Sequence, residues 1–226
     1  MSKESLDRLL RDNQTDWPWW LAYSTRDPKN EIQPLFDVEE EAVRYALEKR
    51  RAEFSAGRDA AHAALTLTGC RPISVPMGKD HAPIWPKDKV GSITHTDNVC
   101  LAVAASSHHA QSIGVDVENL TPIANSYISK VAKPEEIDFV GGAPSLAALR
   151  IFSMKEAGFK AQYYLSKRNL EFDELKVTTG GLLFKHAVPP FPQNFLLPIR
   201  QWANYGLCLS LCVISPQGQN KCRTPW

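Results

Sequence analysis

The chain has 226 residues, of which 43% are hydrophobic, and its formal net charge at pH 7 is +1. This length allows one large domain or two small ones, and the hydrophobic content suffices for a buried core. The near-neutral charge argues against a general affinity for nucleic acid or for a membrane surface. No apolar run reaches the about 18 residues of a membrane-spanning helix, and the polar stretch after Met1 lacks the apolar centre of a signal peptide. We therefore expect no membrane span and a cytoplasmic location.

An aromatic cluster and a long helix are predicted in the first third of the chain. The cluster Trp17-Pro18-Trp19-Trp20 is interpreted as a cap over the core, in preference to an exposed patch. Asp37 is a good N-cap residue, with Glu40 placed for a capping box. Apolar residues then recur at helical spacing to about Leu67, and Gly69 stands where a helix would stop. We therefore predict a helix from Asp37 to about Leu67.

A proline-rich loop and three strands are predicted next. Four prolines between residues 70 and 89 argue against a helix in that stretch. Residues 90–95 and the apolar run 99–105 have strand character, and the polar turn 106–111 leads to a further strand over 113–118. The short polar connection predicts a hairpin between the last two strands.

The second half repeats the order of a helix followed by strands. Residues 119–144 are weakly patterned, and a helix is predicted over 145–165. We therefore predict an α+β fold with two halves that meet near residues 106–112, and divide the chain into residues 1–108 and 109–226. Further strands are predicted over residues 175–178, 181–187, 195–202 and 205–214.

The five cysteines show no spacing typical of a zinc site or of a disulfide framework. Their number is odd, and no Cys-x-x-Cys segment occurs. Cys208 and Cys212 alternate with apolar residues, which is typical of buried thiols on a strand in a reducing compartment.

The segment Gly114-Val115-Asp116-Val117-Glu118 places two carboxylates on one face of a predicted strand. Because side chains alternate along a strand, Asp116 and Glu118 project to the same side, about 7 Å apart. Like charges at that distance repel, and a cation between them relieves the repulsion. Carboxylate oxygens suit Mg²⁺, which often completes its coordination with substrate phosphates. Asp116 and Glu118 are therefore candidate Mg²⁺ ligands.

The predicted helix over 145–165 carries a further polar pair. Phe152, Glu156 and Lys160 lie one turn apart and share a face. Glu156 is a candidate third ligand to the metal, and Lys160 is a candidate contact for a phosphate. An ordinary surface ion pair is the alternative, and it would be preferred if these two residues stood alone.

Basic residues are spaced along the first predicted helix. Arg44, Arg51 and Arg58 are seven residues apart and form a stripe, with about 10.5 Å between successive members. That spacing suits an extended polyanion or an acidic partner, and a solvated basic face is the alternative. Gly57 is costly inside a helix and indicates a close backbone approach beside Arg58.

Two short segments offer further donors to an anion. Lys79 and His81 lie in the proline-rich loop, and Thr94 and His95 end the strand that follows it. A hydroxyl, an imidazole and an ammonium group can each donate to phosphate oxygens. The choice between Lys79 and His81 stays open.

Together these segments resemble the surfactin- and enterobactin-type 4′-phosphopantetheinyl transferases. That family carries (V/I)-G-(V/I)-D-x-E and, further along, (F/W)-(S/T/C)-x-K-E-(A/S)-x-x-K; this chain reads Ile113 to Glu118 and Phe152 to Lys160. The enterobactin-type branch adds an arginine-rich helix ending in Ala-Gly-Arg, and a Trp-Pro pair before a Gly-Ser-Ile-(Ser/Thr)-His strand. Those features match Arg51 to Arg58, Trp85-Pro86 and Gly91 to His95. The resemblance covers about residues 44–165.

The resemblance implies a pseudo-twofold arrangement of two similar α/β halves with the active site between them. It implies that Asp116, Glu118 and Glu156 hold Mg²⁺ against the pyrophosphate of coenzyme A. The serine of an apo carrier protein would attack the β-phosphate, and adenosine 3′,5′-bisphosphate would leave. Glu156 is the candidate for accepting the serine proton, and Lys160 would offset phosphate charge. The implied contacts to coenzyme A are Arg51, Arg58, Lys79, His81, Thr94, His95, Lys155 and Lys160.

The same resemblance implies the partners. A carrier domain of a siderophore, nonribosomal peptide, polyketide or polyunsaturated fatty acid synthase is expected to dock, and residues 119–144 are the predicted docking region. The protein is expected to act as a monomer and to bind no nucleic acid. Thr94 stands where many relatives have serine, which keeps the hydroxyl.

Two other functions use some of the same residue types. A metal-dependent nuclease or phosphodiesterase would use similar carboxylates, but such sites commonly carry Asp followed by Glu-x-Lys on a strand. Here position 120 is leucine, and the lysine follows Glu156 on a helix. A non-catalytic metal-binding module would not need Thr94-His95 or the arginine stripe.

Overall fold

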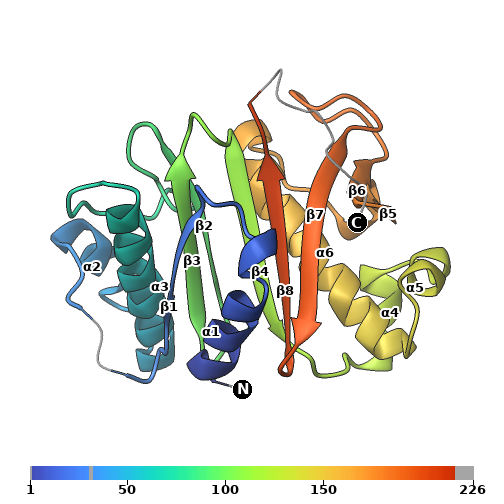
Figure 1. The fold of residues 1–226 in the computed structure, drawn as a ribbon, viewed down its shortest axis with the longest axis horizontal. Coiled ribbons are helices and arrows are strands. Elements are labelled where there is room, and N and C mark those ends of the chain that lie inside the picture. The colour runs from blue at the N-terminus through green and yellow to red at the C-terminus, as the bar shows by residue number, and fades with distance from the viewer. Residues whose placement is uncertain (1, 31–32, 217–226) are drawn as a thin grey trace. The chain divides into compact units, whose positions relative to one another are not determined.

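The computed structural model describes residues 2–30 and 33–216. The chain divides into two compact units, the first ending at Ala110 and the second beginning at Gln111. Each unit combines helices with an antiparallel sheet (Figure 1), so the predicted α+β class is confirmed. Among the described residues no single helix is long and apolar enough to cross a membrane, although the bent pair Pro134–Val140 and Pro144–Ser166 meets those criteria together.

Unit 1 is built on a three-stranded sheet with the strand order β1-β3-β2. The long helix α3 packs along all three strands, and the amphipathic helix α1 buries three leucines near β1. The alanine-rich face of α3 forms a core with Val75 and Trp85. The elements are α1 (Lys3–Asp12), η1 (Gln14–Asp16), β1 (Ala22–Arg26), α2 (Asp37–Val43), α3 (Glu48–Leu67), β2 (Lys89–His95) and β3 (Cys100–Ser106).

Unit 2 is built on a five-stranded sheet with the strand order β4-β8-β7-β6-β5. The long helix α6 lies along β4, β8 and β7, and the short helices α4 and α5 pack against α6 (Figure 1). The elements are β4 (Ser112–Asn119), α4 (Asn125–Val131), α5 (Pro134–Val140), α6 (Pro144–Ser166), η2 (Phe172–Glu174), β5 (Leu175–Thr178), β6 (Gly181–Phe184), β7 (Leu196–Asn204) and β8 (Leu207–Ile214).

The single helix predicted from Asp37 is wrong, because the chain forms two helices with a break over residues 44–47. The cause is a buried carboxylate on α2. Glu39, and not Glu40, accepts a hydrogen bond from the backbone N–H of Phe36 and so caps α2. Its other oxygen lies 2.8 Å from Nε2 of His62 on α3 and accepts from the Val75 backbone. These bonds hold α2 against α3, which a continuous straight helix could not allow.

The predicted hairpin between residues 99–105 and 113–118 is also wrong. β3 pairs with β1 and β2, whereas β4 pairs with β8 of the other sheet. The hairpin partner of β3 is β2, through a tight turn in which the Thr96 backbone N–H donates to the Val99 carbonyl. The segment 106–111 therefore connects the two units and is no hairpin loop.

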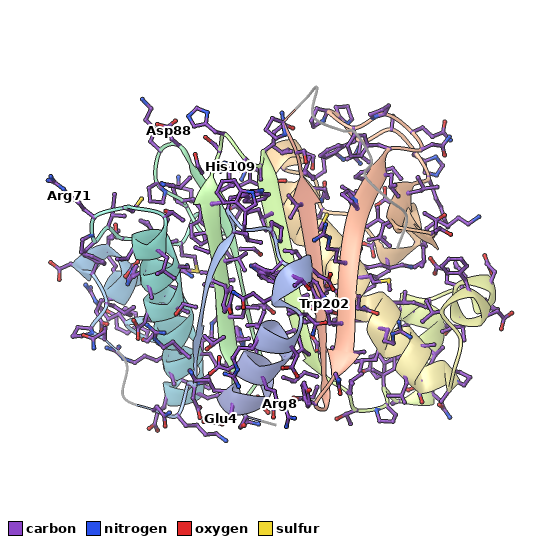
Figure 2. All side chains as sticks on the ribbon, viewed as in Figure 1. Glu4, Arg8, Arg71, Asp88, His109 and Trp202 are labelled. Atoms are coloured by element: carbon purple, nitrogen blue, oxygen red, sulfur yellow. The ribbon has the colours of Figure 1, made fainter. Side chains whose placement is uncertain are left out.

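The aromatic cluster is only partly a cap. Trp17 is buried and its indole N–H donates to the Leu21 carbonyl. Trp19 is 88% exposed, and Trp20 stacks on the ring of His109, whose place at the end of unit 1 is labelled in Figure 2. Cys208 and Cys212 are buried on β8 and form no disulfide, as the alternating pattern predicts.

Candidate active site

The packing of α6 on β4 sets the position of Glu156, on the helix, relative to Asp116 and Glu118, on the strand. A Cβ atom on Gly114 would lie 1.9 Å from the Ala157 carbonyl oxygen and 2.6 Å from the Ala161 nitrogen. The helix backbone therefore rests directly on the strand. The Ser112 hydroxyl donates to the Ala161 carbonyl over 2.7 Å and closes the same contact. Because Asp116 and Glu118 share the face of Gly114, α6 covers the polar face of β4.

Asp116 and Lys160 form a largely buried ion pair across this interface. Lys160 Nζ donates to Asp116 Oδ1 over 2.7 Å and to the Val115 carbonyl over 3.0 Å. The Asp116 side chain is almost wholly buried, whereas Lys160 keeps some solvent exposure. The lysine predicted as a phosphate contact thus lies against the predicted metal strand.

Glu118 and Glu156 are held at raised pKa values. Burial, followed by the neighbouring charge of Asp116, raises the pKa of Glu118 to about 7, with Lys160 opposing and Glu156 reinforcing the effect. Burial raises the pKa of Glu156 as well; Lys160 lowers it and Asp116 raises it. The three carboxylates and the lysine therefore lie within electrostatic reach of one another, and the carboxylates repel each other.

The donor set fits Mg²⁺ in its chemistry. Asp116, Glu118 and Glu156 offer the carboxylate oxygens that this ion prefers, and a divalent cation would relieve the repulsion that raises their pKa values. Lys160 neutralises one of the three charges. Within residues 2–30 and 33–216, no three or more His, Cys, Asp or Glu side chains are arranged so that they could hold a metal ion together, so these carboxylates would have to reorient to bind one.

Lys155 lies elsewhere than the resemblance implies. Its Nζ is buried, donating to Glu136 Oε2 over 2.9 Å and to the Val131 carbonyl over 3.0 Å. Glu136 also accepts from the Val177 backbone and caps α5 through the Lys133 backbone. The pair ties α5 and β5 to α6, so a contact of Lys155 with phosphate would first require this pair to open.

Unit 1 contains a buried cation at Arg58. The side chain is 6% exposed, its guanidinium carbon lies 4.2 Å from the centre of the Phe54 ring, and its Nε has no hydrogen-bond partner among the described residues. Burial lowers the pKa of Arg58 to about 10; Glu39 raises it and Arg50 lowers it further. A phosphate oxygen could accept a charge-assisted hydrogen bond from this Nε–H, so Arg58 is a candidate anion-binding residue.

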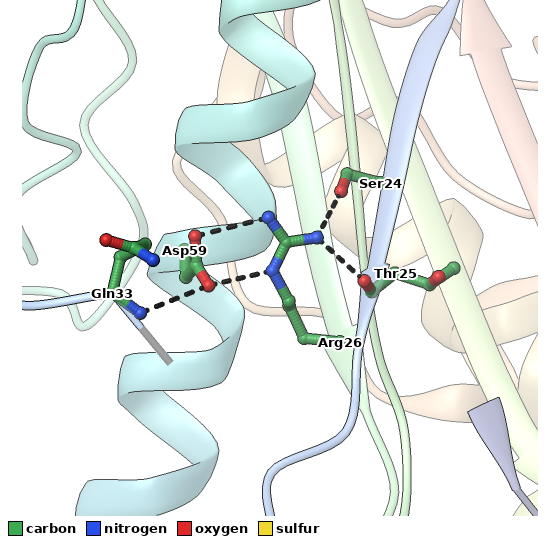
Figure 3. Close-up of polar contacts among 5 residues, drawn as sticks. All are labelled: Ser24, Thr25, Arg26, Gln33 and Asp59. Atoms are coloured by element: carbon green, nitrogen blue, oxygen red, sulfur yellow. Dashed lines mark hydrogen bonds and ion pairs between the residues drawn. The ribbon is translucent and has the colours of Figure 1, made fainter. Parts of the chain in front are cut away.

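The residue next to Arg58 is fully satisfied. Asp59 accepts from Arg26 Nε over 2.7 Å and from Nη2 over 3.2 Å, as Figure 3 shows. Arg26 also donates to the Ser24 hydroxyl and to the Thr25 carbonyl. This bidentate pair fastens β1 to α3.

The remaining predicted phosphate contacts lie on α3, on the loop and at the end of β2. A Cβ on Gly57 would lie 3.1 Å from Ile93 Cγ2, so α3 approaches β2 closely just before Thr94 and His95. Thr94 is buried, and His95 Nδ1 lies 4.0 Å from Glu53 Oε2. The three-arginine stripe does not form on one helix, because Arg44 falls in the break before α3. Arg51 pairs with Glu40 at the surface, and Lys79 and His81 are both exposed.

Comparison with known proteins accounts for both units. The model of the 4′-phosphopantetheinyl transferase N-terminal domain matches residues 38–105, and that of the 4′-phosphopantetheinyl transferase superfamily matches residues 112–187. The 4′-phosphopantetheinyl transferase PptT of Mycobacterium tuberculosis is 33% identical over 165 residues, which cover 70% of this chain and 71% of PptT. The chain belongs to the 4′-phosphopantetheinyl transferase superfamily.

Other members of this superfamily match over a smaller share of their length. The 4′-phosphopantetheinyl transferase Svp of Streptomyces mobaraensis is 35% identical over 161 residues, 68% of this chain and 64% of Svp. The enterobactin synthase component D of Salmonella typhi is 35% identical over 160 residues, 66% of this chain and 64% of that protein. The match thus spans less than two thirds of several of these relatives.

Sequence reasoning missed some polar residues of unit 2 that surround the site. Glu136 carried a readable signal, because it follows Pro134 in a segment typical of a capped helix start. Ser153 lies inside the family motif, but its partner Ser210 and the neighbouring Gln201 lie on strands without any motif. No local pattern could have identified those two.

Proposed function

We propose that the protein transfers the 4′-phosphopantetheine group of coenzyme A to a serine of an apo carrier protein and releases adenosine 3′,5′-bisphosphate. The observation that carries the proposal is the electrostatic coupling of Asp116 and Glu118 on β4 with Glu156 and Lys160 on α6, in a member of this superfamily. The nuclease alternative gains no support from the comparisons.

The proposed metal is Mg²⁺, held by Asp116, Glu118 and Glu156. When bound, it supplies charge neutralisation to the pyrophosphate of coenzyme A. Lys160 adds a positive charge at Asp116, and it would offset the charge of the same phosphates. Glu156 is the proposed acceptor of the serine proton, and burial makes its carboxylate more basic than an exposed one. Catalysis then consists of positioning and charge neutralisation, as in other phosphoryl transfers.

Unit 1 supplies the proposed contacts to the rest of coenzyme A. Arg58 is the strongest of them, because it is a buried cation whose Nε lacks a partner among the described residues. Thr94 and His95, at the end of β2, and Arg51, on α3, are proposed as further phosphate contacts. The proline-rich loop offers Lys79 or His81. Lys155 is better explained by its structural pair with Glu136.

The proposed partner is a carrier protein domain, engaged by a cytoplasmic monomer. Residues 119–144 remain the proposed docking region, and two aromatic side chains there support it. Tyr127 on α4 and Phe139 on α5 are each more than half exposed and offer apolar area to a partner. Two relatives are named for enterobactin synthase and for phosphopantetheinyl transfer, so a siderophore, peptide, polyketide or fatty acid synthase is the proposed setting.

Intact-mass spectrometry tests the proposal. The protein is incubated with coenzyme A, Mg²⁺ and an apo carrier protein, and the carrier should gain the mass of one phosphopantetheine. Exchange of the segment 119–144 for that of a relative should change carrier preference. An unchanged preference would place docking elsewhere in the chain.

A further inference from the structure

Small residues of α6 and β4 line part of the contact between α6 and its sheet. Gly114 lies against the backbone of Ala157 and Ala161, and Gly158 faces Leu182 with no side chain of its own. Large side chains that interlock normally fix how far a helix slides or turns on a sheet. Apolar side chains such as Ile151 contribute to fixing α6 in the core. Polar contacts add to them, beginning with the Ser112–Ala161 and Lys160–Asp116 bonds to β4.

A polar cluster bonds α6 to β7 and β8 about one turn before Glu156. Gln201 on β7 accepts from Arg150 Nε over 3.0 Å and donates through Nε2 to the Arg150 carbonyl over 2.8 Å. The same Nε2 lies 2.9 Å from the Ser210 hydroxyl, which in turn accepts from the Ser153 hydroxyl over 2.9 Å. Ser153 and Ser210 are completely buried. Gln201 is thus bonded to both α6 and β8.

The strand register relates this cluster to the carboxylates. Gln201 is paired with Ser210, and Ser210 is paired with Asp116 across the next strand. The three residues therefore form a row across β7, β8 and β4 on one face of the sheet. Glu156 follows Ser153 by three residues on α6, which is about 4.5 Å along the helix axis. Along α6, Glu156 thus lies between Ser153, which bonds Ser210, and Lys160, which bonds Asp116.

We propose that Gln201 is a positioning residue that sets the axial position and rotation of α6, and thereby the place of the Glu156 carboxylate relative to Asp116 and Glu118. This inference rests on the proposed function, because it gives Glu156 a metal to bind. A slip of one residue along the helix would move Glu156 by about 1.5 Å and turn it by about 100°. Functional sites tolerate only about 0.5 Å.

The test compares Gln201→Met with Gln193→Met. Methionine is similar in length and cannot make the hydrogen bonds of Gln201. Gln193 is a matched control, because it is exposed and its side chain also donates to a backbone carbonyl of unit 2, that of Lys185. Binding of Mn²⁺ alone, followed by electron paramagnetic resonance, reports the metal site without any transfer reaction. We expect Gln201→Met to weaken Mn²⁺ binding about tenfold and Gln193→Met to leave it unchanged.

Two further variants keep the inference open to refutation. Gln201→Glu keeps the acceptor for Arg150 and should lose less Mn²⁺ affinity than Gln201→Met. If Gln201→Met fails to fold, Ser210→Ala removes the Ser153 and Gln201 bonds and should also weaken Mn²⁺ binding. A folded variant that binds Mn²⁺ within twofold of the unmodified protein overturns the positioning role. If the wild-type protein transfers phosphopantetheine to no carrier, the proposed function is overturned, whereas the comparison of Mn²⁺ binding among the variants still stands.

Discussion

The substitution Gly114→Ala tests the contact on which the site is built. The added Cβ would lie 1.9 Å from the Ala157 carbonyl oxygen, whereas ordinary contacts begin near 3.4 Å, so strand and helix would separate by about 1.5 Å. The two atoms that the Cβ would meet most closely, the Ala157 carbonyl oxygen and the Ala161 nitrogen, belong to the helix backbone, so no side chain can turn aside. Overpacking of this kind costs about 3 kcal/mol, which lowers the melting temperature of a chain of this size by about 6–12 °C.

Gly158→Ala on α6 is the matched control for this prediction. Its Cβ would lie 2.7 Å from Leu182 Cδ1, the end of a flexible side chain that can move, and at ordinary contact distances of 3.5 and 4.0 Å from Leu197 Cδ1 and Ile199 Cδ1. Alanine also favours helix over glycine by about 1 kcal/mol, so the two effects should nearly cancel. Both variants are measured by urea unfolding and by Mn²⁺ binding. A Gly114→Ala protein with unchanged unfolding free energy and unchanged Mn²⁺ affinity would refute the close-contact account of the site.

Three further predictions concern individual charges. Arg58→Met should weaken coenzyme A binding, measured by calorimetry, about tenfold or more. The unfolding free energy should stay equal or rise, because the substitution removes a buried cation whose Nε has no partner among the described residues. A loss of stability with normal binding would contradict this prediction. Lys155→Met should destabilise the fold by about 3–5 kcal/mol, because it leaves Glu136 buried without its cation, while the KM for coenzyme A stays near normal in the folded fraction. The third concerns Glu118, whose pKa is raised to about 7 from 4.5, so the folded state retains a proton that the unfolded state releases between those values. This carboxyl therefore makes the unfolding free energy fall as pH rises from about 4.5 to 7, and in metal-free buffer Glu118→Gln should remove that part of the fall.

Local signals in the sequence predicted the elements that hold the motifs. The helix predicted over 145–165 corresponds to α6, and the strand over 113–118 corresponds to β4. Strand alternation and helical spacing also indicated which face of each element carries Asp116, Glu118, Glu156 and Lys160. These features depend only on neighbours in the chain, which explains why a single sequence sufficed.

Long-range contacts account for what the sequence did not reveal. The break before α3 arises because Glu39 bonds His62 and Val75, and both partners lie more than 20 residues away. The pairing of β4 with β8, far along the chain, replaced the expected hairpin. The sequence did not reveal the partner of Lys155, because Glu136 lies 19 residues earlier, on another helix. Such pairs become visible only once the chain is folded.

Transfer measured by intact mass, with Asp116→Ala alongside the unmodified protein, tests the central claim most directly. The unmodified protein with coenzyme A, Mg²⁺ and an apo carrier should make the carrier heavier by one phosphopantetheine. Asp116→Ala should fold, because its loss leaves Lys160 partly exposed to solvent, and should give no gain in mass. Near-normal transfer by folded Asp116→Ala, or no transfer by the unmodified protein to any carrier tested, would contradict the account.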